Sequence, residues 1–332
     1  MSRSRGPCNQ EHITVKGGHC GPLFLYPLHH TRHYSHLLCN IYCLYSIYNS
    51  GKPKINQMEK KKISVIIPCY KGERYIARAL DQVFSQGYEN LEVIVIIDGL
   101  VDNAREIVSQ YPARVIVFEE NRGVSAARNA GIKIAEGEYI HFLDADDELS
   151  SGFYHKMVEA AGDINPDVIA SGVYDELQQH KSQYFSRRRV VRGTYRKLTV
   201  TWGCRLPNCW RYLFKSELLR RYNLEFEEGR IIEDLQFTTR ALYYAKEVVT
   251  APGAIYIYNA TPNSITTTRT ETQKKRIAED FAHATDLIRE FGKEHGFIVP
   301  GRTNVPFKIL FNSWMNYQRF LGFIGLGYKR PV

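Results

Sequence analysis

The segment Glu138-Tyr-Ile-His-Phe-Leu-Asp-Ala-Asp-Asp147 decides how the chain is organised. It begins with a short apolar run, which predicts a buried strand over residues 139–143, and it ends with the carboxylates Asp144, Asp146 and Asp147. Because aspartate is unfavourable in strands, we expect the strand to end there. Two interpretations of the acids are open. They form a solvated turn, or they bind a hard divalent cation, which takes one or two carboxylates besides substrate phosphates.

Upstream of this segment, apolar runs alternate with stretches of helical periodicity. Strands are predicted at 63–68, 92–97, 114–118 and 139–143, and helices at 73–86, 103–110 and 124–135. This alternation predicts a mostly parallel sheet with right-handed crossovers. In such sheets, ligands bind in a crevice beyond the carboxyl ends of the strands. Tyr70, Asp98 and Asp144 each follow a predicted strand, so all of them should face one crevice.

The charge and cysteine content of the chain argue against two classes of protein. The net charge is +9, but residues 1–57 hold six Lys or Arg and one acid, which leaves only +4 for the remainder. The sequence has no basic helix and no zinc-finger spacing, so nucleic-acid binding is not indicated. Its seven cysteines show no paired spacing, and we expect reduced thiols in a cytoplasmic protein rather than a disulfide framework.

Residues 1–57 differ in composition from the rest of the chain. They hold six of the eleven histidines and four of the seven cysteines, without a steady period. Their most apolar run, residues 37–48, is shorter than the ~20 residues that a spanning helix needs. We expect an atypical extension that is disordered or not translated, with translation starting at Met58; a membrane-touching extension is the alternative. The intact mass of the native protein tests this hypothesis.

Four segments, in this order and spacing, resemble family 2 glycosyltransferases of the GT-A fold. They are Ile63 to Tyr70, Glu92 to Gly99, Asn121 to Gly131 and the Asp144-Ala-Asp146 motif, and the resemblance runs from about residue 61 to about residue 265. It implies an α/β protein with a mostly parallel, Rossmann-like sheet flanked by helices. It also implies a nucleotide-sugar-binding half at 58–150, a mixed acceptor and catalytic half at 151–265, and C-terminal helices at 266–332.

The resemblance implies roles for residues of the first half. Pro68 and Tyr70 would lie near the nucleotide base, Asp98 would accept a hydrogen bond from it, Arg128 would steady the diphosphate or the acidic loop, Asp144 would meet ribose or metal, and Asp146 would bind the metal. Structural alternatives are open: a packing ring for Tyr70, an ion-pair strut for Arg128 and a turn cap for Asp98. The family's usual Asp-Asp-Gly-Ser is Ile97-Asp98-Gly99-Leu100 here, a departure that bears on recognition of base and ribose. Uridine is the expected nucleoside.

In the second half, strands are predicted at 167–173 and 248–258, and helices at 152–161, 213–222, 235–245 and 272–291. The basic run 178–192 is interpreted as a solvated loop, or as a contact with an anionic acceptor or membrane surface. The aromatic run 306–328 either packs on the domain or lies at a membrane interface.

A second acidic point, Glu233-Asp234, precedes a predicted helix. The helix dipole alone can explain a carboxylate at this position. The resemblance implies instead that Asp234, with Glu233 as second candidate, is the catalytic base. An inverting transferase needs such a base for the proton of the acceptor hydroxyl, while a metal ion neutralises the leaving diphosphate.

These observations lead to one functional prediction with two alternatives. We expect an inverting, Mg²⁺- or Mn²⁺-dependent glycosyltransferase that moves sugar from a UDP-sugar to a hydroxyl of a glycan or lipid-linked acceptor in polysaccharide synthesis. It would be cytoplasmic, with peripheral contact to the membrane. The alternatives are a non-catalytic nucleotide-sugar-binding protein and a nucleotidyltransferase. The second predicts a Gly- and Lys-rich loop after the first strand, for which Cys69-Tyr-Lys-Gly72 is too short.

Overall fold

The computed structural model describes residues 61–176, 182–201, 208–259, 261 and 270–297. The predictions for residues 1–57 and 306–328 lie outside these ranges. The strands are β1 (Ile63–Cys69), β2 (Leu91–Asp98), β3 (Arg114–Phe118), β4 (Tyr139–Phe142), β5 (Glu148–Leu149), β6 (Val168–Asp175), β7 (Arg189–Val191), β8 (Tyr212–Lys215) and β9 (Val248–Tyr258). The helices are α3 (Ile76–Phe84), α4 (Ala104–Val108), α5 (Val124–Ile134), α6 (Phe153–Ala161), α7 (Thr194–Val200), α8 (Ser216–Arg221), α9 (Glu233–Tyr244) and α10 (Glu271–Glu294).

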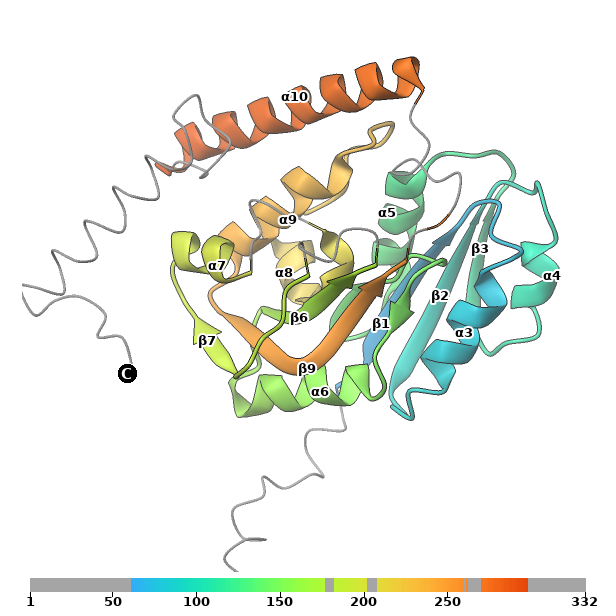
Figure 1. Cartoon of the computed structure of the whole chain (residues 1–332), viewed down its shortest axis with the longest axis horizontal. Helices are drawn as coiled ribbons and strands as arrows, with labels where there is room; N and C mark the ends of the chain where they lie inside the picture. The colour runs from blue at the N-terminus through green and yellow to red at the C-terminus, as the bar shows by residue number, and fades with distance from the viewer. Residues whose placement is uncertain (1–60, 177–181, 202–207, 260, 262–269, 298–332) are drawn as a thin grey trace, which may run out of the picture. The chain divides into compact units, whose positions relative to one another are not determined.

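The described strands form one sheet in the order β3-β2-β1-β4-β8-β6-β9-β5, and β7 pairs with β9 (Figure 1). Strands β3, β2, β1 and β4 are parallel, with Ile63 of β1 opposite both Leu91 and Tyr139. Strand β8 is antiparallel to β4 and to β6, whereas β6 and β9 are parallel. The predicted α/β sheet, parallel in the first half and mixed in the second, is confirmed, and it continues without a break from one half to the other.

Helices cover both faces of the sheet, which explains why its strands are continuous apolar runs. Along β1, Ile63, Val65 and Ile67 pack in the core under α3, α4 and α6, while Ile66 faces the core under α5 and α9 (Figure 1). Helix α5 lies close to the sheet at Gly131, where a Cβ atom would meet Cγ2 of Ile66 at 2.5 Å. This contact fixes the helix that carries Arg128.

Helix α10 packs on α9 and on the loop that precedes it. The Asp280 carboxylate accepts hydrogen bonds from the Ile231 amide at 2.9 Å and the Arg230 guanidinium at 3.0 Å. The ring of Phe291 contacts that of Tyr243 edge-on. The predicted helix 272–291 is therefore confirmed, and its contacts support the start of α9, where the second acidic point lies.

Two predictions of local structure were wrong. Residues 213–222 were expected to form one helix, but Tyr212–Lys215 is strand β8 and the helix begins at Ser216. A strand is favoured at this position because it pairs with β4 on one side and β6 on the other. This pairing satisfies the backbone hydrogen-bonding groups and buries Leu213 completely. The predicted loop 178–192 contains β7, an edge strand that pairs with β9 through Arg189 to Val191.

Candidate functional site: acids at the carboxyl ends of the strands

The loop that follows β4 carries the three acids and is held by the end of β9. The carboxylate of Asp147 is buried and accepts a hydrogen bond from the Tyr256 hydroxyl at 2.7 Å and from the Asn259 amide at 2.9 Å. The Tyr256 oxygen in turn accepts from the backbone amide of Asp144 at 3.3 Å. Asp147 is therefore a structural acid that fixes the loop.

Further bonds fix the backbone between these acids. The carbonyl of Asp146 accepts from the Arg78 guanidinium at 2.7 Å and from the Asn259 side-chain amide at 2.9 Å. Arg78 also pairs with Glu148 at 3.1 Å. Strand β5, which pairs with β9, ends the loop on its other side. Side chains from α3 and β9 thus hold the predicted metal-binding residues in a defined position.

A buried arginine joins the two acidic points that the sequence analysis singled out. The guanidinium of Arg128 on α5 donates to Asp144 at 2.8 Å and to Glu233 at 2.6 Å. Its side chain is only 4% exposed and lies over the ring of Phe226. The structure therefore brings Arg128, Asp144 and Glu233 together, although they come from three separate segments. The sequence analysis considered Arg128 either as an ion-pair strut or as a residue that steadies the acidic loop. In the structure it makes both kinds of contact.

Glu233 and Asp234 occupy different environments at the start of α9. Glu233 is buried and turned toward Arg128, and its second carboxylate oxygen has no partner among the described residues. Asp234 is partly exposed as a residue, but its carboxylate group is surrounded by protein. Burial of its carboxylate and the adjacent charge of Glu233 raise the pKa of Asp234 to about 8. A carboxylate with such a pKa is a stronger base than an ordinary aspartate, which is what general-base catalysis near neutral pH requires.

The acidic loop fits a divalent cation completed by ligand oxygens. Burial, followed by the neighbouring charge of Asp144, raises the pKa of Asp146, so the charged form of Asp146 is disfavoured in the protein alone. In the described part of the chain, no group of three His, Cys, Asp or Glu side chains is placed to hold a metal ion. Asp144 and Asp146 would be the residues to hold a divalent ion, with substrate phosphates and water completing its coordination.

The predicted donor-binding residues of the first two strands are placed differently from one another. Pro68 is the sixth residue of β1 and is partly buried. Tyr70 follows the strand and is 46% exposed, so it is not a core packing residue. The carboxylate of Asp98 is buried and accepts hydrogen bonds from the amides of Arg122 and Gly123, at 2.6 and 2.9 Å. The roles proposed for Pro68 and Tyr70 in base binding stay predictions.

Several residues that shape this site were not identified from the sequence. Tyr256 and Asn259 hold the acidic loop from more than a hundred residues away along the chain, and Arg78 reaches it from α3. A tyrosine in a strand and an arginine on a helix are common features, so no local signal marks them.

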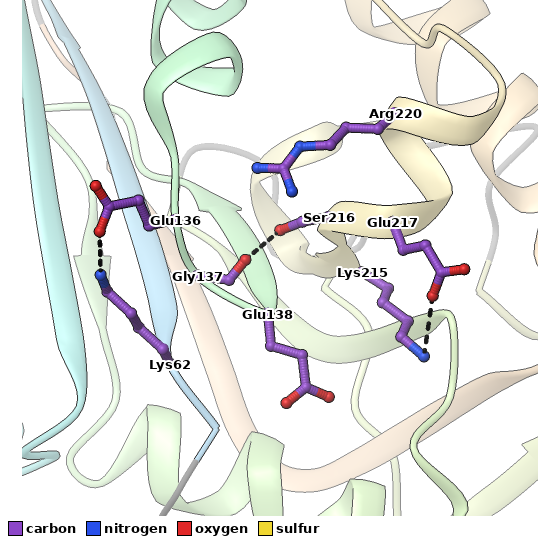
Figure 2. A pocket seen from close by; sticks show the side chains of 8 residues that line it. All are labelled: Lys62, Glu136, Gly137, Glu138, Lys215, Ser216, Glu217 and Arg220. Carbon is purple, nitrogen blue, oxygen red and sulfur yellow. Dashed lines mark hydrogen bonds and ion pairs between the residues drawn. The ribbon is translucent and has the colours of Figure 1, made fainter.

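A pocket of about 400 Å³ lies at the opposite end of the sheet, where β1 and β4 begin (Figure 2). Its charged side chains are paired: Lys62 with Glu136 at 2.8 Å, and Lys215 with Glu217 at 3.8 Å. The guanidinium of Arg220 donates to the carbonyl of Ala135 at 2.6 Å. None of the predicted site residues lines this pocket, so it is not the candidate site.

The fold and the site define a doubly wound α/β protein whose acids gather at the carboxyl ends of its strands, where such sheets bind ligands. Residues 64–222 match the family model described as Glycosyl transferase family 2. The chain carries a family 2 glycosyltransferase domain. Within the described residues, no helix is both long and apolar enough to cross a membrane.

Relatives and solved structures agree with this assignment. The chain is 32% identical to the uncharacterized glycosyltransferase EpsJ of Bacillus subtilis over 61% of this chain and 62% of EpsJ. It is 29% identical to the minor teichoic acid biosynthesis protein GgaB of the same organism, over 59% of this chain but 22% of GgaB. The chain thus spans less than two thirds of either relative. The crystal structure of S. aureus TarS with UDP-GlcNAc is 23% identical, with a TM-score of 0.59 over 68% of this chain and 65% of that one. This likeness shows the GT-A fold that was predicted.

Proposed function

We propose that this protein is an inverting glycosyltransferase, dependent on a divalent cation, that moves sugar from a UDP-sugar to a hydroxyl of a glycan or lipid-linked acceptor. The observation that carries the proposal is the pair Glu233-Asp234 beside Arg128. Because Glu233 is bound to Arg128, Asp234 is the carboxylate of the pair that is left to take a proton. Peripheral membrane contact follows from the acceptor class and is part of the same proposal.

The proposed reaction forms one bond, breaks one bond and transfers one proton. The acceptor hydroxyl oxygen attacks the anomeric carbon of the donor, while the bond from that carbon to the diphosphate oxygen breaks. Asp234 takes the hydroxyl proton, and the nucleoside diphosphate leaves with the electron pair. Attack on the face opposite the leaving group inverts the anomeric configuration, so the base and the groups that bind the leaving diphosphate must act from opposite sides of the sugar. In the proposed arrangement, Asp234 at the start of α9 acts from one side, and the acidic loop after β4 holds the diphosphate on the other.

Asp144 and Asp146 are the residues that would hold the cation. When bound, a divalent ion neutralises negative charge on the leaving diphosphate. Arg128 orients Asp144 from the side of α5, and the Asp147–Tyr256 bond fixes the loop backbone. These bonds hold the carboxylates in place before donor binds, which favours little reorganisation during the reaction.

The relatives support the class of donor and acceptor. GgaB is named as a teichoic acid biosynthesis protein, and the TarS structure contains UDP-GlcNAc. These names favour a nucleotide-sugar donor and a cell-surface polymer as acceptor.

The experiment that tests the proposal measures transfer by the full chain. A panel of UDP-sugars is incubated with Mn²⁺ or with EDTA, and release of UDP and the anomeric configuration of the product are followed. Metal-dependent turnover with inversion supports the proposal, whereas retention of configuration contradicts it. Binding of UDP without turnover of any donor and acceptor would favour the non-catalytic binder. Release of pyrophosphate from UTP and a sugar 1-phosphate would favour the nucleotidyltransferase.

A further inference from the structure

The segment 182–201 combines a strong positive charge with a position at the margin of the sheet. It holds six Lys or Arg and no Asp or Glu. It folds as β7 and α7, and β7 pairs with the first residues of β9 (Figure 1). The other edge of β7 has no strand partner among the described residues. The segment is therefore placed where it can meet a partner outside the chain.

Two of the six cations have a structural explanation. The Arg188 guanidinium donates to the carbonyl of Ala160 at 2.6 Å, at the end of α6. The Lys197 ammonium is buried and donates to the carbonyl of Tyr243 at 3.1 Å, at the end of α9. Cations are favoured at the carboxyl ends of helices, where carbonyl groups lack partners. These two side chains therefore serve the fold.

The remaining arginines of β7 and its flanks are exposed. Arg192 pairs with Glu247 through its Nε at 2.7 Å. Arg187 and Arg189 form no ion pair with the residues that the structure describes, although their backbone is fixed by two hydrogen bonds with the Thr250 hydroxyl. The local backbone is thus ordered, while the charge of these two side chains is left uncompensated.

Both strand geometry and packing place this charge on the side of the sheet that carries α7 and α9. Side chains alternate between the two faces along a strand. Val191 packs in the core under α9, whereas Val190 packs against the opposite core, under α6. Arg189 shares the face of Val191, and Arg196 is exposed on the neighbouring helix α7 (Figure 1).

Exposed aromatic rings accompany these arginines. Tyr184, just before β7, is 56% exposed, and Tyr195, on α7, is 38% exposed. Charge on an edge strand also prevents pairing with other chains, and this would explain the arginines alone. It does not call for exposed tyrosines. Tyrosine together with Lys or Arg is typical of protein surfaces that contact the headgroup region of a membrane.

We propose that this surface binds an anionic lipid bilayer. We name it the basic edge, and it comprises Tyr184, Arg187, Arg189, Tyr195 and Arg196. The inference rests on the proposed function, for which it identifies the surface that contacts the membrane. Helix α9 ends beside the basic edge, at the carbonyl bound by Lys197, and begins at the candidate base. Its twelve residues rise by about 18 Å, so a lipid-linked acceptor would need a reach of this order.

Sedimentation of the full chain with lipid vesicles tests the proposal. One set of vesicles contains phosphatidylcholine alone, and the other contains equal parts of phosphatidylcholine and phosphatidylglycerol. We expect binding to the anionic vesicles that weakens as salt is added, because the attraction to the surface is screened. No preference for anionic over neutral vesicles overturns the proposal.

Substitutions at the basic edge give the decisive comparison. The double variant Arg187→Ser, Arg189→Ser should weaken binding to anionic vesicles by about 10–30-fold, at about fivefold for each arginine. Arg187→Lys, Arg189→Lys keeps the charge and should bind like wild type. The matched control is Arg74→Ser, Arg105→Ser, which removes the same charge from exposed positions in the first half of the chain. An equal loss in this control overturns the proposal, because binding would then depend on net charge alone.

A soluble polyanion separates a membrane from a polymer as the partner. If the basic edge binds polyphosphate but not anionic vesicles, the proposal is overturned in favour of an anionic polymer. Turnover of UDP-sugar with a short soluble acceptor is measured in the same preparations and should not change in Arg187→Ser, Arg189→Ser. Wild-type turnover without vesicle binding contradicts the basic edge alone. Vesicle binding without any turnover contradicts the proposed function and leaves the lipid contact standing.

Discussion

Charged side chains gather at both ends of the sheet, but only at the amino end are they matched in pairs of opposite sign. At the amino end, the pocket charges are matched, as in the pairs Lys62–Glu136 and Lys215–Glu217. At the carboxyl end, Asp144, Asp146, Asp147, Glu233 and Asp234 gather, and in the described part of the chain Arg128 alone forms ion pairs with members of this group. Burial and mutual repulsion raise the pKa of Asp146 and Asp234.

The difference between the two ends lies in whether each charge has a partner of opposite sign within the protein. Matched, exposed pairs contribute little to stability and need no partner. Crowded, buried acids destabilise the fold until a cation or a proton compensates them. Unmatched charge at one end of the sheet therefore indicates a ligand more clearly than the presence of a pocket does at the other end.

The largest effect should come from Asp234→Asn. This change removes the general base but keeps the size of the side chain, and turnover should fall by about 10²–10⁴-fold. Initial rates of UDP release measure the loss, and calorimetric titration of UDP should show donor binding unchanged. The matched control at the amino end is Glu217→Gln, which should keep full activity. Equal rates in wild type and Asp234→Asn would exclude Asp234 as the base.

Arg128→Gln should cause the largest loss of stability. It leaves Glu233 and Asp144 without their counter-charge, and breaking a buried ion pair costs about 3–5 kcal/mol. Urea denaturation followed by circular dichroism gives the change in free energy of unfolding. The comparison is Arg220→Gln at the amino end, where an exposed side chain donates to a carbonyl and about 1 kcal/mol or less is expected. Similar losses in both variants would contradict the contrast between the two ends.

Asp146→Asn should affect ligand binding and stability in opposite directions. Loss of a partner of a metal ligand costs about 10–100-fold in metal affinity, so loss of a ligand itself should cost at least that. UDP binding in the presence of Mn²⁺ should weaken accordingly. Stability without metal should rise or stay the same, because the substitution removes one of two repelling carboxylates. A variant that loses stability while keeping metal-dependent UDP binding would contradict this assignment.

The pH dependence follows from the raised pKa of Asp234. The base acts when deprotonated, so the rate should rise as pH increases and level off above about pH 8. Stability should change the other way. Between the ordinary aspartate pKa and about 8 the folded state binds more protons than the unfolded state, so the free energy of unfolding falls as pH rises. Rate profiles and urea midpoints from pH 5 to pH 9 measure both; a rate that falls across this range would contradict the assignment.

The smallest effect is expected at the amino end. Lys215→Met breaks its pair with the exposed Glu217, and the free energy of unfolding should change by about 1 kcal/mol or less. Thermal denaturation and the rate assay should both give values close to wild type. A marked loss of activity would show that the amino-end pocket takes part in function.

The sequence by itself determined the alternation of strands and helices, the parallel first half of the sheet, and the position of Asp144 and Asp146 beyond a strand end. These features follow from local periodicity and from the poor fit of aspartate to a strand, which act within a few residues. Residue types alone also marked Glu233-Asp234 as an acidic pair before a helix. They did not distinguish the two carboxylates from each other.

Only the tertiary structure decided how these acids are used. Arg128 forms an ion pair with Glu233. Tyr256 and Asn259 donate hydrogen bonds to Asp147, and the loop before α5 donates hydrogen bonds to Asp98. Strand β8 likewise formed where a helix was expected, because its neighbours offered pairing on both sides. The physical reason is the same in each case. Burial favours a partner for most polar groups, and the partner comes from a distant segment that local sequence patterns do not specify.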